Sequence, residues 1–199
     1  MERIIRAVVL GLTLAIPLSG WAGLAAAAPA EAPVAPADVV PGIWQHHKVT
    51  VSYFGITAAY SCDALEDHVR SILLHLGARN DAKVNANGCP GGPDRPSRNA
   101  WIETDFYTLV PADTASAASA AAVKAHWAAR EITPRQPYFM GDGDCELIEQ
   151  MKDLISKNFS LRDVQFQTEC VPHEIMVNGF SIKGQALIAV APPGGVKGA

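Results

Sequence analysis

Several features that would point to a specific chemistry are missing from this 199-residue chain. It contains no C-x-x-C pair for thiol–disulfide exchange, no H-E-x-x-H zinc motif and no G-x-S-x-G nucleophile elbow. It also lacks a basic tract, and its formal net charge is −4, so we expect no nucleic acid as a partner. Beyond the first 28 residues no long apolar run occurs, which predicts no membrane span after that segment.

The segment 1–28 has the order of residues that is typical of a secretory signal peptide. Arg3 and Arg6 precede an apolar run, and alanine-rich residues follow it. An uncleaved membrane anchor is the competing interpretation, but a proline and a glycine interrupt the run. Overlapping A-x-A sites predict cleavage between Ala27 and Ala30. We therefore expect a periplasmic or secreted protein.

All four cysteines lie in the predicted mature part, and an even number in an exported chain predicts disulfides. Cys62 and Cys145 each come at the start of a predicted helix, and Cys89 and Cys170 each come at the end of the following strand. In a strand–helix–strand unit with parallel strands, the helix begins above the carboxyl end of the second strand. The bonds Cys62–Cys89 and Cys145–Cys170 are thus predicted, each joining a helix start to a strand end.

The hydropathy pattern runs through the same order of elements twice. Strands are predicted at 48–55, 82–89 and 100–110, and again at 123–132, 164–170 and 180–190. A helix follows the first strand of each set, with Ser61 and Asp144 as expected N-caps. The apolar positions that recur at helical spacing are Leu65, Val69, Ile72, Leu73 and Leu76 in the first helix, and Ile148, Met151, Ile155 and Phe159 in the second.

This order predicts an α+β fold built from two tandem β-α-β-β repeats. We expect both helices on one face of a mixed sheet, with a disulfide in each repeat. One six-stranded sheet and two small packed sheets are both compatible with the pattern. The predicted division is a signal peptide (1–28), a flexible Pro/Ala-rich lead-in (29–42), the first repeat (43–112), a linker (113–122), the second repeat (123–191) and a flexible tail (192–199).

Four segments, "YSCDALEDHVR", "LGAR", "NGCP" and "GDCELIEQ", resemble a group of uncharacterised exported bacterial proteins. The resemblance covers most of residues 60 to 170. It implies an exported, disulfide-linked protein and assigns no activity and no catalytic residue.

A metal site is the chemical alternative that has most support in the sequence. His68 and His75 lie seven positions apart on the first predicted helix and thus share one side of it. A metal needs three or four converging ligands, and no dense histidine tract supplies them. We expect no bound metal and no cofactor.

If the crossovers are parallel, the loops that follow their strands gather at the disulfide end. Binding sites in such sheets usually lie beyond these strand ends, where helix N-termini converge. The residues predicted to form a ligand or partner rim there are Tyr60, Ser61, Asp63, Arg95, Arg98, Asp142, Asp144 and His173.

The leading functional hypothesis is an exported, non-catalytic module of the envelope or secretome that binds a protein or a small ligand. The alternative is a periplasmic protein that handles copper or zinc. An enzyme of unrecognised type ranks third, because no catalytic constellation stands out.

Overall fold

The computed structural model describes residues 39–90, 92–113 and 121–190. The predicted signal peptide, the lead-in up to residue 38, most of the linker and the tail lie outside these residues. The described elements are β1 (Val39–Phe54), α1 (Cys62–His75), β2 (Lys83–Asn87), β3 (Asn99–Pro111), β4 (Val123–Ile132), the 3₁₀ turn η2 (Asp142–Asp144), α3 (Cys145–Asn158), β5 (Leu161–Thr168) and β6 (Phe180–Ala189). None of the helices within them is long and apolar enough to cross a membrane.

The strands form one six-stranded sheet in the order β2-β3-β1-β4-β6-β5. Every neighbouring pair is antiparallel, so the prediction of a mixed sheet is wrong. The reason is that β3 lies between β1 and β2, and β6 lies between β4 and β5. The segment with α1 connects the parallel strands β1 and β2, and the segment with α3 connects the parallel strands β4 and β5. In neither case are the two connected strands neighbours in the sheet.

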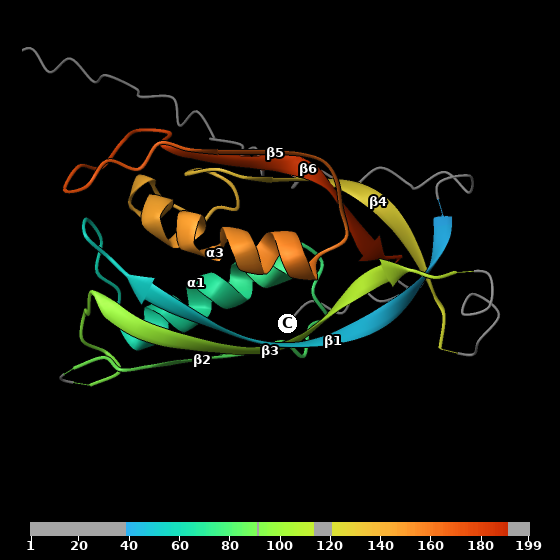
Figure 1. Cartoon of the computed structure of the whole chain (residues 1–199), viewed down its shortest axis with the longest axis horizontal. Helices are drawn as coiled ribbons and strands as arrows, with labels where there is room; N and C mark the ends of the chain where they lie inside the picture. The colour runs from blue at the N-terminus through green and yellow to red at the C-terminus, as the bar shows by residue number, and fades with distance from the viewer. Residues whose placement is uncertain (1–38, 91, 114–120, 191–199) are drawn as a thin grey trace, which may run out of the picture. The chain divides into compact units, whose positions relative to one another are not determined.

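The junction between β1 and β4 is short. These strands pair only through residues 39–42 and 123–126. Residues 39–42 were predicted to be the end of a flexible lead-in, whereas they form the start of β1. Beyond the junction the half-sheets β2-β3-β1 and β4-β6-β5 separate, and Figure 1 shows α1 and α3 between them.

The two helices begin in different ways. The hydroxyl of Ser61 accepts a hydrogen bond from the Ala64 N–H at 3.1 Å, which confirms Ser61 as the N-cap of α1. Asp144 occupies the N-cap position of α3, but its side chain makes no capping bond there. Its carboxylate accepts from the Gly141 N–H at 2.6 Å instead, and thereby closes the turn that precedes the helix.

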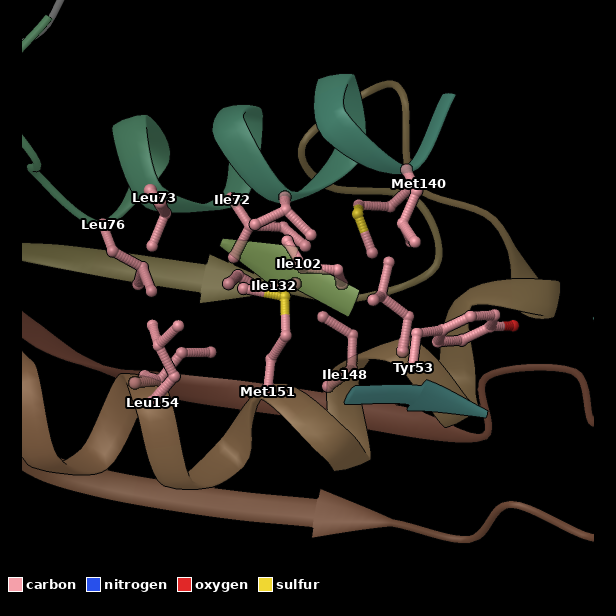
Figure 2. Close-up of a cluster of buried hydrophobic side chains, with 14 of the residues drawn as sticks. Tyr53, Ile72, Leu73, Leu76, Ile102, Ile132, Met140, Ile148, Met151 and Leu154 are labelled. Carbon is pink, nitrogen blue, oxygen red and sulfur yellow. The ribbon is translucent and has the colours of Figure 1, made fainter. Parts of the chain in front are cut away.

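The main core lies between the helices and the inner faces of both half-sheets. Figure 2 shows Ile72 and Leu73 of α1, and Leu76 directly after it, pointing toward Met151 and Leu154 of α3. Ile102 of β3 and Ile132 of β4 are fully buried in the same cluster. The apolar positions predicted on the two helices are all buried, which confirms the helical spacing. Burial of a side chain of this size stabilises the fold by roughly 1.5–3 kcal/mol.

Gly77, just past the end of α1, has a φ of +97°, a value that favours glycine. A Cβ at this position would lie 2.6 Å from Cγ2 of Ile188. Gly77→Ala is therefore expected to lower the free energy of unfolding by about 2 kcal/mol, measured by urea denaturation. Gly143→Ala is the matched control, because a Cβ at Gly143 has no heavy atom within 4 Å. Equal stability of the two variants would contradict this account.

Both predicted disulfides are present. The Sγ atoms of Cys62 and Cys89 lie 2.05 Å apart, and those of Cys145 and Cys170 lie 2.02 Å apart. Each bond joins the first residue of a helix to the chain just beyond a strand, as the crossover argument requires. The described residues contain no free cysteine.

Candidate binding surface

The loops of the two half-sheets meet at the disulfide end. The loop after β1 contacts both the start of α3 and the loop after β5. The Thr57 hydroxyl oxygen accepts a hydrogen bond from the His173 N–H at 3.0 Å. Gln150 of α3 accepts from the Phe54 N–H at 2.8 Å and donates to the Phe54 carbonyl at 2.9 Å. The disulfide end is thus a single structure to which both halves contribute.

Glu146 holds this end together. Its carboxylate is only 8% exposed and accepts hydrogen bonds from the backbone N–H groups of Ile56, Thr57 and Ala58 at 3.0–3.4 Å. A buried carboxylate is stable only when donors replace its lost water. Here the donors come from one loop, so the side chain fixes the conformation of residues 56–58 against α3.

A second polar cluster surrounds Asp144, which is 4% exposed. The Tyr60 hydroxyl donates a hydrogen bond to this carboxylate. His68 Nδ1 donates to the Ala64 carbonyl at 2.8 Å, and its Nε2 lies 3.7 Å from Asp144 Oδ1. Burial and the neighbouring Asp144 carboxylate raise the pKa of Tyr60 far above its ordinary value. Tyr60 therefore stays protonated and donates its hydrogen bond to Asp144.

Half of the predicted rim residues serve the architecture of this end. Ser61 caps α1, and Tyr60 and Asp144 pair with each other. Asp142 accepts from the Asn178 N–H at 2.8 Å, which holds the β5–β6 loop. These four side chains hydrogen-bond within their own protein, so each has an architectural role at this end.

The remaining rim residues are exposed to solvent. Arg98 donates to the carbonyl oxygens of Gly55 and Ile56, so it also supports the first loop. Asp63 and Arg95 lie beside the first disulfide, on α1 and in the β2–β3 loop. His173 has a φ of +68° and lies in the β5–β6 loop. The structure does not bring these four side chains together as one ligand pocket.

Several large apolar side chains are exposed at this end, and their exposure was not predicted from the sequence. Seven large apolar residues are exposed in the described part of the chain, and all except Val164 lie on loops or strand ends at the disulfide end. The exposed residues at this end are Phe54, Trp101, Tyr138, Val171, Ile175 and Val177. Tyr138 is 95% exposed, and Ile175 and Val177 are 65% and 68% exposed. A sequence signal existed, because "VPHEIMVNG" is apolar in part yet fits neither a strand nor a helix.

The hollows among the described residues differ in size and place. The hollow beside the second disulfide holds only about 10 Å³, which is room for a single water. A hollow of about 320 Å³ lies on the outer face of the first half-sheet, over Lys48, Lys83 and Glu103. Another of about 400 Å³ lies beside β5 and β6 and extends to the disulfide end, where Thr133, Arg135 and Asn178 line it. The disulfide end therefore offers mainly an open surface for contact.

No three histidine, cysteine, aspartate or glutamate side chains converge as metal ligands within residues 39–90, 92–113 and 121–190. His68 and His75, the predicted alternative, are separated and each bonded to backbone. His75 Nε2 donates to the Glu131 carbonyl at 2.9 Å, and burial lowers the pKa of His75.

Comparison with protein-family models, curated proteins and solved structures found no match to this chain.

Proposed function

We propose that the protein is an exported, non-catalytic module that binds another protein through the loops at its disulfide end. The observation that carries this proposal is the concentration of exposed apolar side chains there. Soluble proteins rarely expose many large apolar residues at one place unless a partner covers them. Aromatic residues such as Phe54, Trp101 and Tyr138 are also enriched in protein interfaces.

The restraints on these loops support binding of a protein surface. Cys62–Cys89 and Cys145–Cys170 hold the start of each helix, and Glu146 fixes the loop between them. A surface that is ordered before binding loses less conformational entropy when a partner docks. The polar rim residues then have a supporting role, since they hold the loops that present the apolar side chains.

Export is part of the proposal. Two disulfides are consistent with an oxidising compartment, and the first 28 residues have the pattern of a signal peptide. The resemblance to exported bacterial proteins agrees with the same location.

We further infer that the two halves are repeats of one ancestral unit. Val40 and Val123, Trp44 and Trp127, Cys62 and Cys145, and Arg79 and Arg162 are each 83 positions apart. The first two pairs meet in a small second core around Leu109, Ala125 and Leu187. Each tryptophan ring lies under the arginine of its own half, with the guanidinium 5.8 Å from the Trp44 ring and 3.8 Å from the Trp127 ring.

Photo-crosslinking in cells of the native organism tests the binding proposal. A photoreactive phenylalanine analogue placed at Ile175 or Val177 is expected to form a discrete covalent adduct with another protein, detected on a gel and identified by mass spectrometry. Apolar interface residues lie close enough to the partner for this reaction.

Val164 provides the matched control, because it is 40% exposed but lies on β5, away from the loops. The analogue at Val164 is expected to give no such adduct. The proposal fails if positions 175 and 177 give no adduct, or if Val164 gives the same one.

A further inference from the structure

One edge of β1 has no strand partner among the described residues beyond the short junction with β4. Up to Phe54, β1 pairs with β3 along its other edge, while β4 accompanies only residues 39–42. An unpaired strand edge presents a row of N–H and C=O groups that can pair with another extended chain.

The direction of these backbone groups follows from two hydrogen bonds. The Gly55 N–H donates to the Arg98 carbonyl on the β3 side, at 2.7 Å. The Phe54 N–H points to the other side, where Gln150 accepts it. Because the direction alternates along a strand, the N–H and C=O groups of Ser52, Thr50 and Lys48 also point to the open edge.

A groove of about 400 Å³ runs along this edge, between β1 and α3. On the β1 side it is lined by residues 49–52. On the α3 side it is lined by one stripe of the helix, made of Gln150, Asp153, Leu154, Lys157 and Asn158. Leu154 is only 3% exposed, so the apolar floor is formed mainly by the half-buried Val49 and Val51.

Hydrogen bonds that tie α3 to the first half-sheet lie near both ends of the groove. At one end the amide of Gln150 pairs with the N–H and C=O of Phe54, as a residue of a neighbouring strand would. At the other end the Thr108 hydroxyl donates to the Asn158 carbonyl at 2.7 Å. The open length corresponds to roughly four strand residues at about 3.3 Å each.

The charges in the groove are paired. Lys157 Nζ lies 2.8 Å from Asp153 Oδ2, and Lys48 Nζ lies 3.4 Å from Asp105 Oδ2 on the outer face. The walls thus favour an uncharged partner. Since side chains alternate along a strand, an added strand would place every second one beside Val49 and Val51 and the others beside Thr50 and Ser52.

We propose that this groove binds an extended segment of another protein, added to the sheet as a strand beside β1. Backbone pairing with Thr50 and Ser52 gives affinity, and the floor selects small apolar side chains at alternate positions. At the positions between these apolar side chains, the bound segment carries uncharged polar side chains. A second copy of this chain that paired through its own β1 edge fits less well. Its α3 would then contact the α3 stripe of the first copy, which carries two charged and two amide side chains.

The groove adjoins Phe54 but is lined by none of the exposed apolar residues of the proposed function, so it can be tested by itself. Short linear peptides are selected from a phage-displayed library against the mature protein, and their affinities are measured by fluorescence anisotropy. Thr50→Pro removes the N–H that faces the open edge and leaves the bonds to β3 intact. We expect it to weaken the selected peptides about tenfold or more, whereas Thr50→Ala retains binding.

Asp153→Trp is the second variant, because it narrows the groove from the exposed side of α3 without altering β1. It should also weaken binding, and the amide resonances of Thr50 and Ser52 should shift on peptide addition. Equal binding to both variants, unshifted amides, or a library that gives no binder would overturn the proposal. A dimer that forms at high concentration and is lost in Thr50→Pro would assign the edge to a second copy instead.

Discussion

Removing either disulfide is expected to lower the free energy of unfolding by about 3.5 kcal/mol. The bonds close segments with sequence separations of 27 and 25 residues, and the unfolded chain gains the corresponding freedom when a bond is lost. The two losses should be nearly equal, because the entropy of loop closure depends only on the logarithm of the loop length. The variants are Cys62→Ala with Cys89→Ala, and Cys145→Ala with Cys170→Ala.

Equilibrium urea unfolding, with the slope m checked for constancy, measures this loss. Non-reducing peptide mapping of the unmodified protein provides the control, since it must recover the two expected linked peptide pairs. A Cys62–Cys145 linkage would contradict the arrangement of both half-sheets, and a loss below about 1 kcal/mol would show that the bonds are not the main restraint.

Features that depend on neighbours in the sequence were predicted well. The buried stripes of α1 and α3 follow from helical spacing, and Ser61 caps α1 because a serine directly before a helix can bond to the N–H of its third residue. The disulfides also followed, because a helix that connects two parallel strands begins above the end of the second one.

Features that depend on distant pairing were not predicted. Insertion of β3 and β6 between the crossover strands makes every neighbouring pair antiparallel, and no local pattern specifies this order. Pro41 and Gly42 break the alternation at the start of β1, so the strand was expected only from residue 48. The open edge of β1 exists because β4 pairs only with residues 39–42, and it could not be predicted for the same reason.

The candidate site shows the same limit. Asp144 precedes a helix, which predicts a helix cap. Its carboxylate instead accepts a hydrogen bond from Tyr60, which is 84 positions away in the sequence. Glu146 reads as an exposed acid in the first turn of a helix, where the helix dipole favours it. Its burial under residues 56–58 depends on the packing of one half against the other. Hydropathy could have found Ile175 and Val177, since they lie in a segment with no element to bury them.

Replacing Glu146 by alanine is expected to lower the free energy of unfolding by about 3 kcal/mol. The change leaves the N–H groups of Ile56, Thr57 and Ala58 without their acceptor in a partly buried loop. Each unsatisfied donor costs roughly 1–3 kcal/mol, and partial access of water to this loop keeps the sum near the lower end. Glu146→Gln retains one acceptor oxygen, so its loss should be intermediate.

Glu149→Ala is the matched control, because Glu149 lies one turn along the same helix, is exposed, and has only a 3.5 Å contact with the Thr168 hydroxyl. Its effect should stay within about 0.5 kcal/mol.

Hydrogen exchange distinguishes a local from a general effect: in Glu146→Ala the amides of residues 56–58 should exchange faster than those of β3. If Glu146→Ala and Glu149→Ala unfold alike, the carboxylate does not hold the loop. The ordered surface that the apolar side chains need would then depend on the disulfides and on the bonds of Gln150 and Arg98 to the loop after β1.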